Sequence, residues 1–353
     1  MKRRAFSLTE LLVVITILVI LIAIAVPAFR SLLGNSERSL AENQLRVGLS
    51  AARDAAIRSD GGDAAAVFFF TGGRVRIIAC VQVGTLCDAG PTTPCTNTDV
   101  FAPLGTIEPV QLPVGWSVRG YAPPGSIGQV GEAHAWYESF SGLSNEGTWV
   151  FPETDFVSLD GTNVETRGVQ RHTFFVRFRA GDGALDTSNR RSILVLDPVR
   201  TESFRGAAPY AVARADQATD LAQFAKRTLA LLGQPAAGAS GDARALFGDE
   251  SVDTILARPV TELSLHEEGR LIAAVGARPN RVTGTLYAPP DENAQYALYD
   301  ATVLPAGVDQ DETQRRVGAW IEGRLDIGAG LVGTDARVFM VQRYLGNMQE
   351  ISP

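Results

Sequence analysis

Residues 5–29 of this 353-residue chain, AFSLTELLVVITILVILIAIAVPAF, decide the fold. The part from Leu11 to Phe29 contains nineteen residues and no charge. As an α-helix with a rise of 1.5 Å per residue it would extend about 28 Å, close to the roughly 30 Å hydrocarbon core of a bilayer. The sequence therefore predicts a transmembrane helix over residues 11–29.

The charges before this run predict its direction. Lys2, Arg3 and Arg4 form a short cationic start. Basic residues beside a membrane span stay on the cytoplasmic side. We therefore expect a single-pass protein whose N-terminus is cytoplasmic and whose remaining chain, after Phe29, lies on the far side of the membrane.

Glu10 does not fit an ordinary anchor, because it lies directly against the apolar run. An acidic side chain at the centre of a membrane helix costs about 2.5–3.5 kcal/mol on insertion scales unless a partner neutralises it. Cleavage of the chain before Phe6 would create such a partner, a free α-amino group. Glu10 is therefore a candidate for pairing with an N-terminal amine.

The stretch Ala5-Phe6-Ser7-Leu8-Thr9-Glu10-Leu11-Leu12 resembles the class III leader of type IV pilins and type II secretion pseudopilins. The resemblance implies that prepilin peptidase cuts between Ala5 and Phe6, and that Phe6 is then N-methylated. Glu10 would be the fifth mature residue and would meet the N-terminal amine of a neighbouring subunit, while Pro27, the twenty-second, would kink the helix. The family normally has Gly before the cut, and this chain has Ala5.

Two other interpretations of the N-terminus stay open. A secretory signal peptide also has a basic start and an apolar run, and Ala23-Ile24-Ala25 offers a small-residue cleavage site. An uncleaved anchor would explain the length and direction of the run. Neither explains Glu10 at its edge, so we favour the prepilin-like interpretation.

The same helix is predicted to continue beyond the membrane. Ala41, Leu45, Leu49, Ala52 and Ala56 recur at spacings of four and three, which is typical of an amphipathic helix. Helix signals end near Arg58, before Asp60-Gly61-Gly62-Asp63. We expect a leader over residues 1–5 and one long helix within residues 6–60.

A pilin-like β head is predicted over residues 61–200. Val67–Thr71 and Arg74–Val83 flank Gly72-Gly73, the pattern of a tight hairpin. Phe174, Val176 and Phe178 alternate with Phe175, Arg177 and Arg179, as in a strand with one face on a core. Further strands are expected at 115–121, 148–151 and 192–196. The order of a long helix, a hairpin and then antiparallel strands resembles the GspH/FimT-like pseudopilins over residues 1–200.

Residues 201–353 exceed what such subunits normally contain, and we expect an α+β extension or small second domain there. Asp216–Leu232 reads as a helix, and residues 234–241 read as a Pro/Ala/Gly/Ser linker. Residues 261–265 and 270–275 read as a second hairpin, and residues 337–344 as a late strand. The predicted class is α+β, a long N-terminal helix packed on an antiparallel β-sheet head with an α+β C-terminal region.

No catalytic constellation stands out. The net charge of −7 argues against nucleic-acid binding, which depends on clustered cations. His134, His172 and His266 lie far apart without useful neighbours, so we expect surface or hairpin residues. Adjacent acids such as Glu267-Glu268 are expected to be solvated. We therefore expect a protein that is not an enzyme and has no cofactor.

The sequence leaves open whether the cysteines form a disulfide and whether acidic residues bind calcium. Cys80, Cys87 and Cys95 could form one disulfide in an oxidising compartment, or could remain three unpaired thiols. Asp182 with Asp186, or Asp309 with Asp311, could supply oxygens to Ca²⁺, but neither segment has EF-hand spacing. Calcium is therefore an open assignment, and no metal ligands are predicted.

The resemblance and the charges together predict a structural subunit, of the minor type because its head is large. It would assemble with other pilin-like subunits into a type II secretion pseudopilus or a type IV pilus, after insertion in the inner membrane with a periplasmic head. Its partners would be prepilin peptidase, those subunits and the inner-membrane assembly platform. The alternative is a membrane-anchored or exported periplasmic binding module or enzyme.

Overall fold

The computed structural model describes residues 8–59, 61–88, 96–124, 147–154, 172–188, 191–196, 254–281, 283–287, 302–328, 330–344 and 346–351. The chain divides into two units, Met1–Asn43 and Gln44–Pro353, and each is described by itself. The predicted helix at 216–232 and the linker at 234–241 lie outside the described residues.

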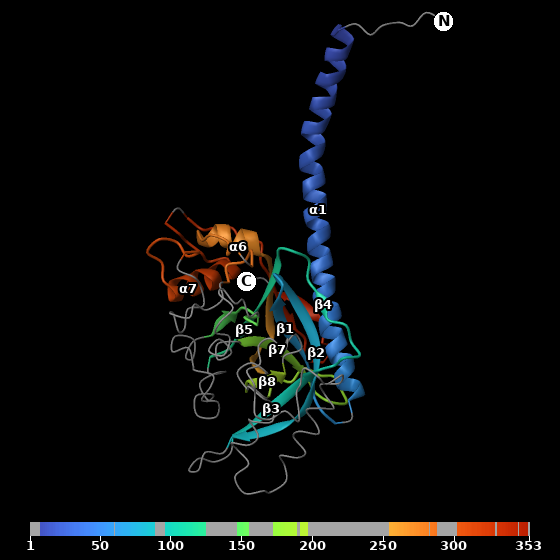
Figure 1. The fold of residues 1–353 in the computed structure, drawn as a ribbon, viewed down its shortest axis with the longest axis vertical. Helices are drawn as coiled ribbons and strands as arrows, with labels where there is room; N and C mark the ends of the chain where they lie inside the picture. Colours follow the sequence, from blue (N-terminus) through green and yellow to red (C-terminus); the bar gives the residue numbers. More distant parts are fainter. Residues whose placement is uncertain are drawn as a thin grey trace, which may run out of the picture. The chain divides into compact units, whose positions relative to one another are not determined.

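Helix α1 spans Leu8–Arg58 and is drawn in blue in Figure 1. It confirms the long helix predicted within residues 6–60. Among the described residues, no helix is long and apolar enough to cross a membrane, so the predicted span over 11–29 is not confirmed.

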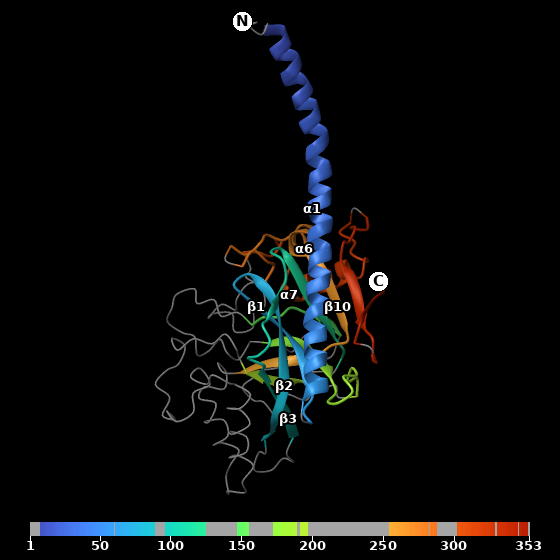
Figure 2. The ribbon, with the colours of Figure 1, turned by 90° about the vertical axis from the view of Figure 1, so that its right-hand side faces the viewer.

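The C-terminal turns of α1 belong to the second unit and cover strand β2, as Figure 2 shows. Leu45, Leu49, Ala52 and Ala56 are all buried, which confirms that part of the predicted amphipathic face. Gly48 faces Ile77 so closely that an added Cβ would lie 2.7 Å from its side chain. The absence of a side chain at Gly48 therefore allows the helix to approach the sheet.

Six strands close into a β-barrel. They pair in the order β1-β7-β9-β8-β3-β2, β2 pairs again with β1, and β4 adds to β2 outside the closed ring. The pairs β3–β8 and β7–β9 are parallel and the others are antiparallel. Their bounds are β1 Ala64–Thr71, β2 Arg74–Asp88, β3 Thr96–Pro103, β4 Val110–Gln111, β7 His172–Phe178, β8 Ile193–Leu196 and β9 Thr254–Pro259.

The barrel interior is a core of alternate residues from all six strands. Phe69, Phe101 and Phe175 are its largest side chains and are completely buried. Because side chains alternate across a strand, Phe174, the neighbour of Phe175 on β7, faces out of the barrel. Its ring stacks on that of Phe68 at a centroid distance of 4.5 Å. Strand β7 thus has a core on both faces, where we expected only one.

The second sheet is entirely antiparallel, in the order β12-β11-β10-β5-β6. Its strands are β5 Trp116–Ala122, β6 Thr148–Val150, β10 Glu262–Glu267, β11 Arg337–Val341 and β12 Met348–Ile351. It packs against the outer face of the barrel, where Phe174 lies so close to Gly120 that an added Cβ would be 2.6 Å from the ring.

Two helices cover the second sheet. Helix α6 spans Glu268–Val275 and helix α7 spans Gln310–Ile321. They share a core with the sheet around Trp320, which is 1% exposed. The hairpin expected from residues 261–265 and 270–275 is confirmed in its first strand, which is β10, and wrong in its second. The second run forms helix α6, in which Leu271, Ile272 and Val275 are buried at helical spacing.

The predicted antiparallel sheet head is thus corrected to a closed mixed barrel with a second sheet, within the expected α+β class. The predicted boundary at residue 200 does not separate these layers. Strand β9 completes the barrel, and β10 lies between β11 and β5 in the second sheet. Segments from both sides of residue 200 therefore build each layer.

Candidate functional site

The first unit exposes a long apolar surface. Between Leu11 and Ile22 every large apolar side chain of α1 is more than half exposed, from 51% at Ile22 to 62% at Leu21. Successive residues turn by about 100°, so this run covers all sides of the helix. The Thr16 hydroxyl donates to the Leu12 carbonyl at 2.8 Å and adds no unsatisfied polar group. A helix that is apolar all round is stable when protein or lipid surrounds it.

The predicted processing and assembly residues lie at the start of this surface. Ala5 and Phe6 lie outside the described residues. Glu10 lies in the first described turn of α1, but its side chain is also outside them. Helix α1 continues through Pro27, and the predicted kink there stays a prediction.

Cys80 lies inside the barrel on β2 and is a free, buried thiol. Burial raises the pKa of this thiol above its ordinary value, which makes it unreactive. Cys87 is seven residues further along the same strand, roughly 20 Å away, so these two cannot form a disulfide. Cys95 lies outside the described residues, and a Cys87–Cys95 bond stays a prediction.

A buried ion pair lies on the face of the second sheet that α6 and α7 cover, where His266 contacts the Trp320 ring. Arg119 of β5 donates two hydrogen bonds to Glu268 at the start of α6, at 3.1 and 3.2 Å. Arg119 also contacts His266 Nε2 of β10, and the Leu286 amide donates to Glu268 Oε1 at 3.1 Å. His266 is a strand residue of β10 and is completely buried, so it is not the surface or hairpin residue we expected. Glu268 is 2% exposed, so the expectation of a solvated acid is also wrong.

The charges of this cluster determine its protonation. Burial lowers the pKa of His266, and the Arg119 charge adds to this effect, so the imidazole is neutral near pH 7. Burial by itself would raise the pKa of Glu268, but Arg119 and the hydrogen bond from His266 outweigh it, and the net shift is downward. Arg119, His266 and Glu268 are all at most 2% exposed, so the cluster is closed to solvent.

A second buried acid, Glu153, lies against strand β7 of the barrel. Glu153 Oε2 is 3.3 Å from His172 Nδ1, and both side chains are at most 7% exposed. Burial raises the pKa of Glu153 well above its ordinary value, and the charges of Arg258 and Arg119 only partly oppose this. Burial also lowers the pKa of Arg258 to about 10. His172 is therefore a buried strand residue and not the surface or hairpin residue we expected. We name Arg119, Glu153, His172, Arg258, His266 and Glu268 the ionic layer.

The calcium candidates are engaged in other contacts. Asp186 lies 3.5 Å from Arg177, which also pairs with Asp63 and Asp99 at one end of the barrel. Asp182 forms an exposed ion pair with Arg179, and Asp309 caps α7 by accepting from the Glu312 amide. Within the described ranges, no three His, Cys, Asp or Glu side chains are placed to hold a metal ion.

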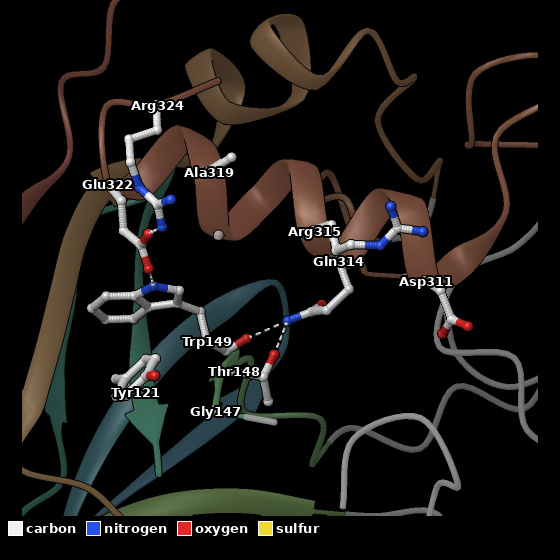
Figure 3. Close-up of a pocket in the computed structure, with 11 residues that line it drawn as sticks. Tyr121, Gly147, Thr148, Trp149, Asp311, Gln314, Arg315, Ala319, Glu322 and Arg324 are labelled. Carbon is white, nitrogen blue, oxygen red and sulfur yellow. Dashed lines mark hydrogen bonds and ion pairs between the residues drawn. The ribbon is translucent and has the colours of Figure 1, made fainter. Parts of the chain in front are cut away.

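A pocket of about 540 Å³ lies between α7 and the edge strand β6. Figure 3 shows Gln314 extending from α7 to β6, where its amide nitrogen donates to Thr148 Oγ1 at 2.8 Å and to the Trp149 carbonyl at 2.7 Å. At one end, the Trp149 ring nitrogen donates to Glu322 at 3.3 Å, and Glu322 also pairs with Arg324. Asp311 and Arg315 lie at the other end.

The lining of this pocket is polar, and its charges balance. Its charged side chains are two acids and two arginines, Asp311, Glu322, Arg315 and Arg324, so their charges cancel. Glu322 and Gln314 are held by neighbours. This volume and lining suit a small polar ligand.

The sequence offered signals for both sites that our reasoning missed. Arg119 and His266 each interrupt an apolar strand at a position where a side chain must face a core. Asp309 followed three residues later by Glu312 is a helix start signal, and Val317, Trp320 and Ile321 follow at helical spacing. These signals predict α7 and one wall of the pocket.

Comparison with known proteins finds one match. Residues 1–26 match the family model of the prokaryotic N-terminal methylation motif. No curated protein and no solved structure matches the chain. The matched residues include Ala5, Phe6 and Glu10, so the N-terminus is that of a type IV prepilin-like protein. The finer GspH/FimT-like assignment rests on the sequence resemblance alone.

Proposed function

We propose that the chain is a minor pilin-like subunit of a type II secretion pseudopilus or a type IV pilus. The methylation motif over residues 1–26 carries this proposal. It implies processing by prepilin peptidase, methylation of Phe6 and assembly with other pilin-like subunits. The exposed apolar surface of α1, which lies within the matched residues, fits burial among the helices of neighbouring subunits.

The energetics of assembly follow from that surface. Leu11 to Ile22 would first be buried in the inner membrane and then among the helices of neighbouring subunits. Burial of apolar area contributes about 25 cal/mol per Å² withdrawn from water, and this term is not directional. A directional contact must therefore set the register, and we assign this role to Glu10 with the methylated amine of the next subunit.

The size of the head supports a minor position. The second unit comprises Gln44–Pro353, a barrel with a second sheet and two helices. A unit of this size on every subunit would crowd its neighbours along a filament. Counting subunits in purified filaments tests this point, and a stoichiometry equal to that of the main subunit would contradict it.

Mass analysis of the N-terminus tests the proposal as a whole. We expect a mature chain that starts at methylated Phe6. A start at Val26 would indicate a secretory signal, and an intact Met1 would indicate a simple anchor. Either result would refute the proposal.

Replacing Glu10 tests the register role. Glu10→Ala should reach the membrane normally but fail to enter filaments, because the neighbouring amine loses its counter-charge. Thr16→Val is the matched control, since it changes a polar side chain within the same helix surface without removing a charge. Incorporation of Glu10→Ala at the level of the control would contradict the pairing.

A second candidate function rests on the pocket between α7 and β6. Its volume and balanced charges suit a membrane-anchored or exported periplasmic module that binds a small polar ligand. We propose no catalytic step for it. If the mature chain starts at Met1 or Val26, this candidate replaces the filament subunit.

A further inference from the structure

An apolar turn lies on the surface of the head between α7 and β11. Residues 327–333, Ile-Gly-Ala-Gly-Leu-Val-Gly, contain no polar side chain. Ile327 is 50% exposed and Leu331 is 73% exposed. Exposed runs of apolar residues on a soluble surface are unfavourable unless they have a function. We name Ile327 and Leu331 the apolar tip.

The apolar tip is held in a defined position. Asp326 and Leu331 form a β-bridge, and the Asp326 carboxylate accepts from the Gly328 amide at 2.8 Å. Gly328 adopts a φ of 85°, which residues other than Gly rarely adopt. Below the turn, the Trp320 ring nitrogen donates to the Gly333 carbonyl at 3.3 Å. The two exposed side chains are therefore carried at the end of a turn that is tied to the core.

The apolar tip lies at the end of the head from which α1 leaves it. Figures 1 and 2 both show the turn between α7 and β11 at the upper end of the head. Strand β11 leads to the opposite end, where an added Cβ at Gly346 would lie 2.7 Å from the Arg53 side chain. From Gln44 the helix continues without a break toward the membrane-anchored N-terminus that the methylation motif indicates. A subunit anchored through α1 therefore turns the tip end of its head toward the bilayer.

The chemistry of the tip suits a lipid surface better than a protein partner. Protein interfaces are specified by aromatic or arginine anchors and by the polar groups around them, and residues 327–333 supply neither. A fluid bilayer needs no complementary pocket and accepts aliphatic side chains at its surface. Backbone polar groups are costly in hydrocarbon, so only the two tip side chains would enter, while Asp326 at the base of the turn stays among the headgroups.

Two aliphatic side chains are too weak an anchor by themselves. Even one myristoyl chain gives only marginal, reversible membrane binding, and stable anchoring takes a second signal. Helix α1 supplies the other signal here, because it holds the head beside the bilayer and makes insertion of the tip an intramolecular step at high effective concentration. The tip therefore needs to contribute only a small additional free energy.

Insertion of the tip constrains the tilt of α1. From Phe29 to Gln44 a helix rises about 22 Å, and the headgroups cover only about 5–8 Å of this distance. An upright α1 would therefore hold Gln44 about 15 Å above the headgroups. Transmembrane helices tilt by up to about 40°, and because the tip lies to one side of α1 in Figure 1, a tilt toward that side lowers it further than Gln44. We therefore expect the head to lean on the membrane with the flank that carries α7.

We propose that the apolar tip inserts into the periplasmic surface of the inner membrane and forms a second anchor for the subunit before assembly. Its ligand is the lipid bilayer itself, and the contact is apolar. This contact rests on the proposed function and deepens it, because it specifies how the head of the membrane-inserted subunit is held. Entry into a filament then requires the tip to leave the bilayer.

Photo-cross-linking of the full chain in vesicles tests this contact. The vesicles contain phosphatidylethanolamine and phosphatidylglycerol, and benzoylphenylalanine replaces Leu331. Mass analysis then measures the fraction of the probe peptide that carries a lipid. The matched control places the probe at Tyr344, which is 74% exposed in the turn between β11 and β12, at the opposite end of the head. We expect at least about fivefold more lipid adduct at position 331 than at position 344.

A second pair of variants tests the aliphatic side chains without moving the probe. Ile327→Ser should lower the lipid adduct at position 331 at least about threefold, because a polar side chain gains nothing from leaving water. Val114→Ser is the matched control, since Val114 is 64% exposed and apolar but lies outside the tip, and it should leave the adduct within about 1.5-fold of the starting yield. Salt at about 1 M should also leave the adduct unchanged, because screening acts on charges and not on apolar burial.

The outcomes separate this contact from the proposed function. Equal lipid adducts at positions 331 and 344, links from position 331 only to protein, an unchanged adduct in Ile327→Ser or a steep loss at high salt would each refute the contact. Methylated Phe6 and normal filament entry of a chain without such adducts would leave the proposed function intact. Lipid adducts at position 331 of a chain that keeps Met1 would support the contact and refute the filament role.

Discussion

Replacing Arg119 by methionine tests how strongly the buried Arg119–Glu268 ion pair joins β5 of the second sheet to α6. Arg119 is 1% exposed and supplies both hydrogen bonds to the Glu268 carboxylate. Without it the buried charge keeps only His266 and the Leu286 amide as close partners among those described. Removing one partner of a buried pair costs about 3–5 kcal/mol. At roughly 2–4 °C per kcal/mol, the midpoint of thermal unfolding should fall by about 6–20 °C.

A double variant separates the loss of the pair from the loss of packing. Glu268→Gln removes the charge but keeps an oxygen that can accept from the Leu286 amide. Replacing both partners of a buried pair is often close to neutral, whereas an orphaned charge is not. Arg119→Met combined with Glu268→Gln should therefore recover at least about 2 kcal/mol of the loss.

Urea and thermal unfolding of the full chain in mild detergent, followed by circular dichroism, measure these changes. Arg343→Met is the matched control, because Arg343 is exposed and its guanidinium lies over Tyr344. It should change the free energy of unfolding by less than about 0.5 kcal/mol. The reasoning is refuted if Arg119→Met costs less than about 1 kcal/mol, or if the double variant is as unstable as the single one.

Three further results are expected from the same measurement. The folded-state pKa values of His266 and Glu268 are both lowered, so each group contributes to the free energy of unfolding at pH values above its ordinary pKa. These contributions should decrease below about pH 6.5 for His266 and below about pH 4.3 for Glu268. His266→Gln should flatten the step near pH 6.5. Gly48→Val should cost about 1–3 kcal/mol, because its Cβ would overlap Ile77, and a neutral result would contradict the close approach of α1. Trp320→Ala should cost about 3–5 kcal/mol, and a loss below about 1 kcal/mol would show that α7 is not part of the core.

Local sequence predicts the parts of the head that local contacts form. The Gly72-Gly73 turn joins β1 and β2 as expected, with φ values of 59° and 73° and with Thr71 opposite Arg74. A two-residue turn with both φ values positive matches the twist of a hairpin, so two neighbouring glycines are sufficient to predict it. The buried face from Leu45 to Ala56 follows in the same way from spacing within one helix.

The barrel could not be predicted in this way, because closure depends on strands that are distant in sequence. Strand β9 runs parallel to β7 and antiparallel to β8, and residues 197–253 separate it from both. Nothing within Thr254–Pro259 shows which strands it will join. Helix α6 illustrates another limit, since a short apolar run such as Leu271 to Val275 fits a strand or a helix until its packing decides.

The ionic layer was missed because its members were considered one by one. Glu268 and His266 looked like turn residues when we expected a hairpin between residues 265 and 270. Arg119 could be placed on a strand but not paired with a partner 149 residues away. A charged residue at a core position of an apolar strand indicates a buried partner, but the partner is identified only by the register between β5 and β10.

The same long-range pairings order the events of maturation. The first unit is helical from Leu8 to Asn43 and is built from contacts that are local in sequence, and its exposed apolar run lies between Leu11 and Ile22. The barrel, by contrast, stays open until Thr254–Pro259 can pair with β7 and β8, and the second sheet lacks its central strand β10 until then. Contacts between residues far apart in sequence form slowly, because a long loop must close first. A subunit of the proposed kind would therefore hold its helix in the membrane before its head could fold on the far side.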